Sequence, residues 1–205
     1  MVHKGGDTSI LQPTAGRFDL DHAASDRVRG GISITVAAMR HPAPVPSLVS
    51  PDALREALAT FATGITVVTT RSPDGSPVGL TVNSFNSVSL TPPLVLWSLG
   101  ASSSSREAFD SHPFFTVHIL GADQQPLAQR FAGPPAQRFA DLEFSSSANG
   151  VPTLDGCLCV LECARERTVA AGDHVVYFGE VISSHLHAQH QGAALTYHQR
   201  RFGST

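Results

Sequence analysis

Apolar residues alternate with polar ones, or form short runs, through most of the chain after residue 64. The runs are rich in β-branched and aromatic residues, and Gly, Pro, Asp or Ser lies at their ends, which is typical of strands joined by turns. An Asp-Gly pair in the turn 72–77 favours a hairpin between the strands on either side of it. The expected strands are 65–70, 78–83, 94–99, 114–120, 154–169 and 175–187, and a last short strand lies within 193–202.

Helical spacing of apolar residues is confined to short segments. Ser50, followed by Pro51 and an acid, is typical of a helix start, and an apolar stripe continues to Phe61. Two further helices are expected near 104–111, after a run of serines, and at 123–131. Many short strands with few short helices predict a mainly β fold, an antiparallel barrel with helical inserts.

The first 48 residues differ from the rest in composition. They are rich in Gly, Pro, Asp and Arg; residues 28–39 suit one short strand, and 41–47 suit a linker. We therefore divide the chain into an extension, 1–48, expected to be partly disordered or loosely docked, and one domain, 49–205.

Charge and hydropathy exclude several classes of partner. Only 15% of the residues are charged and the formal net charge is −3, so we expect no nucleic-acid partner. No apolar run approaches the ~18 residues of a membrane span, so we expect no membrane partner. The beginning of the chain lacks the apolar segment of a secretory signal.

Three cysteines, Cys157, Cys159 and Cys163, fall on alternate positions of one segment, which predicts that they share one face of a strand. Zinc usually requires a second ligand pair elsewhere, and the sequence has none, so we expect buried thiols and no metal. An odd, closely spaced set favours a reducing compartment, and hence the cytoplasm.

The stretch 79–93, GLTVNSFNSVSLTPP, combines small residues with short, uncharged polar side chains. Small residues let a ligand approach the backbone, and Ser, Thr and Asn offer donors and acceptors without charge. A planar polar ring held by backbone amides and hydroxyls would suit this stretch. A barrel strand with a tight bend explains the same residues equally well.

Three other features favour a ligand when they are taken together. The serines at 102–105 open a helix, where free amides favour an anion, although a solvated cap is the commoner case. Arg130 lies late in a helix and is by itself an ordinary surface residue. His174, in a Gly-Asp-His turn, would reach a carboxamide or a hydride donor, or would be satisfied by the turn backbone. We find no carboxylate pair and no Ser/His/Asp set.

These motifs occur in a familiar order. FATGITVVTT, GLTVNSFNSVSLTPPLVLWSL, SSSREAF, FFTVHIL, LAQRFA, GVPTLDG, LEC and AGDHVVYFGEV follow one another between about residues 52 and 202. The sequence resembles the short-chain flavin reductases that serve two-component flavin-dependent monooxygenases. The resemblance implies an FMN-binding split β-barrel of Greek-key type, a homodimer, bound FMN or FAD, NADH or NADPH as hydride donor, and delivery of reduced flavin to a partner monooxygenase.

The resemblance also implies roles for individual residues. Flavin-lining residues would be Val78, Gly79, Leu80, Thr81, Asn83 and Ser84 on one strand, and Ser98, Leu99 and Gly100 on the next. Ser104 and Ser105 match the phosphate position, and Arg130 and Phe131 match a further flavin contact. Asp173 and His174 match the motif near the nicotinamide, and His174 is the expected catalytic residue.

Three departures from the family pattern concern the nicotinamide side and the entry of substrate. His118 stands where Asn is usual, Gln137 begins a triplet that is usually acidic-Arg-Phe, and the tail keeps Tyr197 but loses a Gly and a second Tyr. Two other functions fit the same barrel: a non-catalytic flavin- or heme-binding protein, and an oxidase related to pyridoxamine-phosphate oxidase. The Gly-Asp-His turn favours a user of pyridine nucleotides over both.

Overall fold

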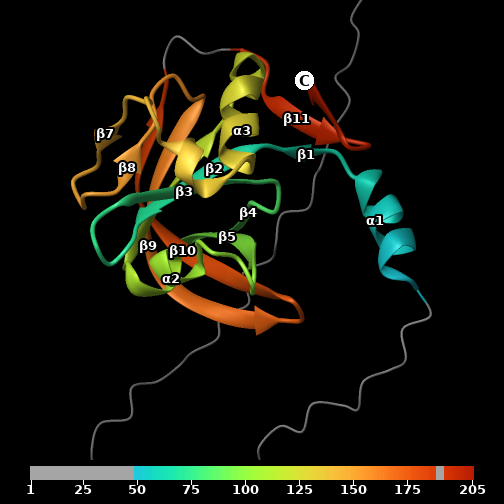
Figure 1. Ribbon diagram of the computed structural model, residues 1–205, viewed down its shortest axis with the longest axis horizontal. Coiled ribbons are helices and arrows are strands. Elements are labelled where there is room, and N and C mark those ends of the chain that lie inside the picture. Colours follow the sequence, from blue (N-terminus) through green and yellow to red (C-terminus); the bar gives the residue numbers. More distant parts are fainter. Residues whose placement is uncertain (1–48, 188–191) are drawn as a thin grey trace, which may run out of the picture. The chain divides into compact units, whose positions relative to one another are not determined.

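The computed structural model describes residues 49–187 and 192–205, which form the domain in Figure 1. The extension that the sequence predicts at 1–48, with its short strand, lies outside the described residues, so this division of the chain stays a prediction. The helices are α1 (Pro51–Ala59), α2 (Arg106–Ser111), the 3-10 helix η1 (Ala122–Gln124), α3 (Gln125–Ala132) and α4 (Pro135–Arg138). Within the described part of the chain, none of them is long and apolar enough to span a membrane.

The strands make one large antiparallel sheet and two small ones. The large sheet has the order β3-β2-β6-β9-β10-β5-β4, and β1-β11-β12 and β7-β8 form the small sheets. The strands are β1 (Thr63–Gly64), β2 (Thr66–Arg71), β3 (Pro77–Val82), β4 (Asn86–Leu90), β5 (Pro93–Gly100), β6 (Phe114–Ile119), β7 (Ser145–Ser146), β8 (Pro152–Thr153), β9 (Cys159–Ala171), β10 (His174–Leu186), β11 (Leu195–His198) and β12 (Arg201–Ser204). The predicted class, mainly β with a few short helices, is confirmed.

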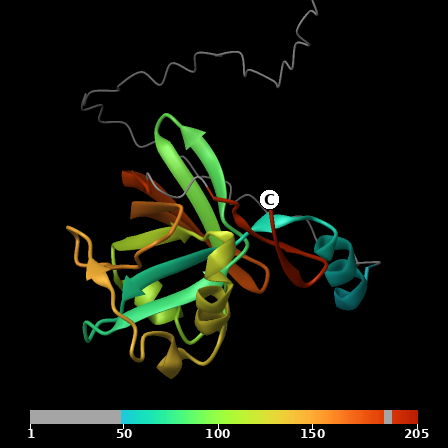
Figure 2. The same ribbon diagram turned by 90° about the horizontal axis from the view of Figure 1, so that it is seen from above.

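The structure contains elements that the sequence did not predict: the short strands β1, β7 and β8, the helix α4, and one additional strand in each of two hairpins. The polar run after Val82 contains an additional strand, β4, which pairs with β5 to form the hairpin that extends from the domain in green in Figure 2. The tail forms a hairpin, β11–β12, rather than one strand, and its turn places Gln199 and Arg200 at φ values of 48° and 60°. The two strands that were not predicted, β4 and β12, are the last strands of their sheets and are mostly exposed, so they carry little of the apolar alternation that identifies a strand.

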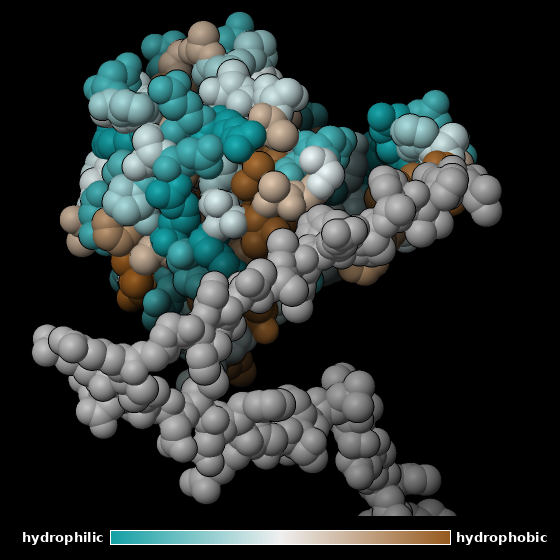
Figure 3. Space-filling model, turned by 90° about the horizontal axis from the view of Figure 1, so that it is seen from below, coloured by the Kyte–Doolittle hydropathy of each residue, from teal (hydrophilic) through white to brown (hydrophobic). Residues whose placement is uncertain are grey.

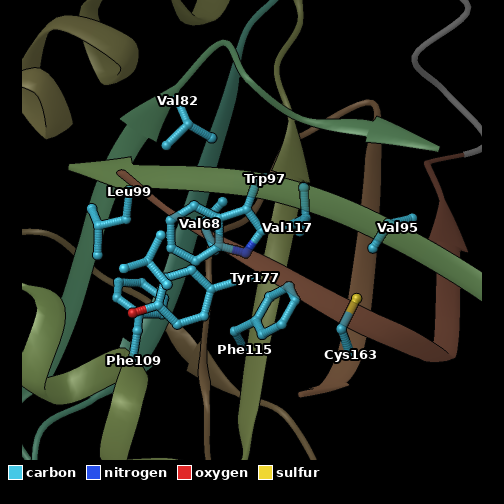
Figure 4. Close-up of a cluster of buried hydrophobic side chains, with 11 residues drawn as sticks. Val68, Val82, Val95, Trp97, Leu99, Phe109, Phe115, Val117, Cys163 and Tyr177 are labelled. Carbon is cyan, nitrogen blue, oxygen red and sulfur yellow. The ribbon is translucent and has the colours of Figure 1, made fainter. Parts of the chain in front are cut away.

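One core cluster lies inside the large sheet. Its buried side chains come from six strands and α2: Val68, Val82, Val95, Trp97, Leu99, Phe109, Phe115, Val117, Cys163, Val175 and Tyr177 (Figure 4). The cluster includes Val82 of β3 and Leu99 of β5, although four strands separate β3 from β5 in the sheet order. The sheet therefore curls around the cluster until these two strands lie opposite each other.

Aromatic rings fill the centre of this cluster. Trp97 stacks on Tyr177 with ring centroids 4.8 Å apart and an interplanar angle of 13°, and Phe109 and Phe115 meet Trp97 edge-on (Figure 4). The Tyr177 hydroxyl donates a hydrogen bond of 2.6 Å to Asp110, which satisfies the polar end of a ring that is otherwise in the core. These contacts fix β5 against β10 and α2.

A second cluster covers the outer face of β2. Val67 points into it, with Ala128 and Phe131 of α3, while Val68 points into the first cluster. Both faces of β2 are therefore buried, which explains the unbroken run of β-branched residues in this strand. Thr66, Thr69 and Thr70 direct their hydroxyls to backbone carbonyls, so the threonines of this run are buried without loss of hydrogen bonds.

The prediction for the cysteines is correct in their burial and wrong in their placement. Cys157 lies before β9, after a turn in which Gly156 has φ +74°, and it packs in the second cluster, whereas Cys163 packs in the first. The three therefore do not share one strand face. All three are free and buried, and burial raises the pKa of Cys157 to about 11 and that of Cys163 to about 12. Such thiols are chemically quiet near neutral pH.

His118 is fully buried on β6 and both of its ring nitrogens are bonded to backbone. Nδ1 donates to the Val67 carbonyl at 3.0 Å, and Nε2 accepts from the Leu154 N–H at 3.0 Å. A second proton on the ring would break the bond to Leu154. Burial accordingly lowers the pKa of His118 to about 4. This departure from the family pattern is a structural residue of the core.

We expect the free energy of unfolding to fall as the pH is lowered from about 6.5 to about 4. In this window the unfolded His118 binds a proton and the folded one does not, which corresponds to about 3 kcal/mol. His118→Asn should remove this component. Urea unfolding at neutral and acid pH measures it, with the exposed His198→Asn as the control. The same pH dependence in wild type and His118→Asn would contradict this account.

Candidate functional site

A cavity of about 200 Å³ lies between the ends of β3 and β5, next to the β9–β10 turn. Its walls are Leu80, Thr81, Val82, Asn83, Ser84, Ser98, Leu99, Gly100 and His174. Strand pairing brings the last of these to the others: His174 is the register partner of Gly100, and the Ala101 N–H donates to the Asp173 carbonyl at 2.8 Å. The cavity thus unites most of the residues that the sequence predicted for a flavin site, from three separate segments.

The hydroxyl of Ser84 bridges the two main walls. It accepts from the Ser98 N–H at 2.9 Å and donates to the Ser98 carbonyl at 3.2 Å. β3 and β5 are not paired with each other, so this side chain replaces the missing strand pairing at this point. Ser84 therefore holds the cavity in shape.

The hydroxyl of Thr81 is also occupied by the protein. It donates to the Ala128 carbonyl at 2.6 Å and so anchors α3 to β3. β3 is an edge strand of the large sheet, so one row of its backbone N–H and C=O groups has no strand partner. The side chain of Asn83 forms no hydrogen bond with another described residue. The groups left for a ligand are thus backbone groups of β3 and the Asn83 amide.

Two of the predicted glycines have different surroundings. A Cβ at Gly100 would meet no atom within 4 Å, so this position is open. A Cβ at Gly79 would lie 2.8 Å from Cε1 of the buried Phe131 ring and 3.1 Å from Thr69 Cγ2. Gly79 therefore allows α3 to pack on β3, and neither it nor Phe131 lines the cavity.

The remaining predicted residues lie around the cavity rather than in its walls. Val78 packs against the first core cluster, and Arg130 donates to the Ala140 carbonyl at 2.6 Å. Ser104 is exposed and Ser105 is buried, at the start of α2. Asp173 accepts a hydrogen bond of 2.8 Å from Nδ1 of His174, and this bond lowers the pKa of Asp173. The contact fixes the ring of His174 from its Nδ1 side.

Arg138 is the second residue of the triplet that begins at Gln137, and no role was predicted for it from the sequence. Its Nη1 donates to the Gly79 carbonyl at 2.8 Å and lies 3.4 Å from Ser105 Oγ, and its Nε donates to the Gly133 carbonyl at 2.9 Å. Burial lowers the pKa of Arg138, and no described carboxylate pairs with it. A half-buried cation without a counter-charge therefore adjoins the serines at the start of α2. This role was not predicted because segment 136–150 has no regular pattern.

Two grooves continue from the cavity, and both share Asn83 with it. The first, about 410 Å³, is lined by Ile65, Thr81, Asn83, Gln129, Ala132, Gly133, Tyr197 and Phe202. The second, about 860 Å³, runs from Ser84 toward α1 and the β11–β12 turn. Both grooves thus adjoin the cavity at Asn83.

The residues present fit a flavin. An uncharged cavity beside an edge strand suits a planar ring with several polar edge atoms, and Arg138 with Ser104 and Ser105 would suit a phosphate. Within the described ranges, no group of three or more His, Cys, Asp or Glu side chains could hold a metal ion. The fold and the site thus define a mainly β domain suited to a planar, polar cofactor.

The comparisons with known proteins agree with this class. Residues 58–205 match the flavin reductase like domain, and the chain therefore belongs to that family. It is 43% identical over 159 residues to "FMN reductase (NADH) SmoA" of Agrobacterium fabrum, which covers 78% of this chain and 88% of the relative.

Two solved structures are similar in fold and in sequence. Nitrilotriacetate monooxygenase component B from Mycobacterium thermoresistibile has a TM-score of 0.72 and 32% identity, over 75% of this chain and 86% of that one. The NADH:FAD oxidoreductase of Streptomyces globisporus, in complex with NAD and FAD fragments, has a TM-score of 0.69 and 34% identity, over 77% and 95%.

We expect Gly79→Ala to destabilise the domain by about 1–3 kcal/mol, because its methyl group would overlap the Phe131 ring, which is buried and cannot move away. Gly64→Ala is the matched control: its Cβ would meet nothing within 4 Å, so its stability should stay within about 0.5 kcal/mol of wild type. Urea unfolding of both variants measures the difference. Equal stabilities would show that α3 does not pack on β3 as described.

Proposed function

We propose that the protein is a flavin reductase that takes a hydride from NADH or NADPH and supplies reduced FMN or FAD to a flavin-dependent monooxygenase. One observation carries the proposal: a single uncharged cavity unites the edge strand 80–84, the strand end 98–100 and His174. The names of two relatives, an FMN reductase (NADH) and a monooxygenase component, support both the reaction and the partner.

The protein's part in this reaction is to bind and orient. Flavin, when bound, supplies the acceptor for a hydride from the nicotinamide. The backbone of β3 and the Asn83 amide would hold the polar edge of the ring, and Ser84 would keep the two walls apart at a fixed distance. Because hydride transfer between two cofactors requires no protein acid or base, the absence of a catalytic carboxylate pair in the sequence is expected.

Arg138 would bind the phosphate of the flavin together with Ser104 and Ser105. Its guanidinium is partly desolvated and directed by two carbonyls, so little further ordering is required for it to bind an anion. Arg130, which the family resemblance favoured, has its Nη2 directed to a carbonyl near α4. Arg130 would therefore affect flavin binding indirectly, by holding in place the segment that carries Arg138.

His174 would serve the nicotinamide. Its Nδ1 is bonded to Asp173, which leaves Nε2 as the atom that can face a carboxamide or a phosphate. The position is exposed and lies in the wall of the cavity, so a second cofactor can reach it after the flavin is in place.

The proposal includes a split-barrel homodimer that works in a reducing compartment, the cytoplasm. Exposed apolar side chains away from the grooves support a second copy: Val88 and Leu90 of β4 are 45% and 91% exposed, and Leu186 of β10 is 81% exposed. Figure 3 shows apolar patches, in brown, on one face of the domain. A pairing of copies would bury them. The free, buried cysteines support the compartment.

The test is the oxidation of NADH and NADPH with added FMN or FAD. We expect oxidation that requires flavin. Gly100→Val should reduce flavin affinity about tenfold or more, because its side chain would project into open space in the cavity wall, while stability stays within about 0.5 kcal/mol. Gly192→Val, at another open position, is the control. A protein that oxidises neither nucleotide with either flavin would contradict the function.

His174→Ala should raise the KM for the nicotinamide nucleotide roughly tenfold, the size of a 1.4 kcal/mol loss, and leave flavin affinity nearly unchanged. Steady-state kinetics and flavin titration measure the two effects separately. If the variant loses flavin and keeps its KM for NADH, His174 belongs to the flavin site. If neither value changes, it is only a turn residue.

A further inference from the structure

The larger groove, about 860 Å³, has three walls. The first wall is α1 with the residues after it: Asp52, Arg55, Leu58, Ala59, Phe61, Ala62, Thr63 and Gly64. The second wall is the segment 83–86, from the end of β3 to the start of β4, and the third is the tail hairpin, with Tyr197 and Arg200. The groove shares Asn83 and Ser84 with the cavity. The groove and the cavity therefore adjoin each other at these two residues.

Arg200 occupies an unusual backbone position in this groove. It is the second residue of the β11–β12 turn, with φ +60°, a conformation that Gly, Asn and Asp adopt most readily. The sequence nevertheless places a long cationic side chain there. The guanidinium of Arg200 forms no hydrogen bond or ion pair with the described residues. A strained position that carries a free cation beside a groove indicates a role in binding.

Arg55 lies across the same groove, and the two walls are tied together. The Gln199 N–H donates to the Ala59 carbonyl at 2.8 Å, which holds the tail hairpin against the end of α1. Arg55 is paired with Asp52 at 2.5 Å, and Asp52 is the one acidic residue that lines the groove. Since Arg55 balances Asp52, Arg200 gives the groove a net positive charge in a chain whose net charge is −3.

We propose that this groove binds the adenosine diphosphate part of a dinucleotide, with Arg200 as the main phosphate contact. Arginine suits phosphate because its planar fork donates two hydrogen bonds to one group. Phe61, Phe85 and Tyr197 line the same groove and offer faces on which a base can stack. The proposal rests on the proposed function, because the reactive ring of the same dinucleotide would lie in the cavity by His174. NADH, NADPH and FAD all contain this part, and FMN does not.

The test compares Arg200→Asn with Arg201→Asn. Asn tolerates positive φ, so the first variant should fold, and the second removes the same charge one position along, outside the groove. Calorimetry with ADP-ribose should show binding to wild type and about fivefold weaker binding to Arg200→Asn. This loss of affinity corresponds to the free energy of one exposed ion pair. The affinity of Arg201→Asn should change little. Arg55→Gln should have a smaller effect than Arg200→Asn, because Asp52 already balances Arg55.

Two further measurements distinguish the sources of the ligand. A raised KM for NADH with FMN as acceptor assigns the groove to the hydride donor, and weaker FAD binding with unchanged FMN binding assigns it to the flavin; both support the proposal. Equal ADP-ribose affinity in all variants, or none in wild type, overturns it. So does a change in oligomeric state on sedimentation without a change in ADP-ribose affinity, which would assign the groove to a second copy. If wild type oxidises no NADH, the proposed function fails, and ADP-ribose binding still shows whether the groove binds adenosine diphosphate.

Discussion

The packing of β3 and β5 against one core is the constraint on which the rest of the structure depends. Val82 and Leu99 belong to one buried cluster although four strands lie between their strands in the sheet. The sheet can satisfy this only by curling, and curling brings two unpaired strands face to face. The hydroxyl of Ser84 then bonds to the Ser98 backbone across the opening. A cavity at this point is a consequence of the way the sheet closes.

The chemical character of the cavity follows from the residues that line it. Strand ends, small residues and a short hydroxyl line it, and Arg138 donates to the carbonyl of Gly79, the residue before the cavity wall begins. Such a site can bind an uncharged ring and an anionic tail separately. That division suits a cofactor whose own ring carries the chemistry, and it leaves the protein the tasks of orientation and of access for a second cofactor.

Much of the fold and of the site could be predicted from the sequence, for identifiable reasons. β-branched runs marked the buried strands, and motifs in a fixed order indicated the residues at 80–84, 98–100 and 174, which the structure places together. Contacts made only in three dimensions could not be predicted. Gly79 is small because Phe131 packs on it, and Arg138 reaches Ser105 from a segment without periodicity. The apolar stripe predicted the helix α1 correctly, but it did not predict that the apolar side chains of this helix are exposed. Periodicity shows that a helix has an apolar face and does not show what covers that face.

The location of the flavin is the central claim, and hydrogen–deuterium exchange with and without saturating FMN or FAD tests it most directly. The account predicts slower exchange of the amides at 80–84 and 98–101 when flavin is bound, because flavin would cover the free edge of β3 and the end of β5. Exchange at β7 and β8, whose residues do not line the cavity, should not change. Protection confined to other segments, or no protection at 80–84 at saturating flavin, would contradict the account.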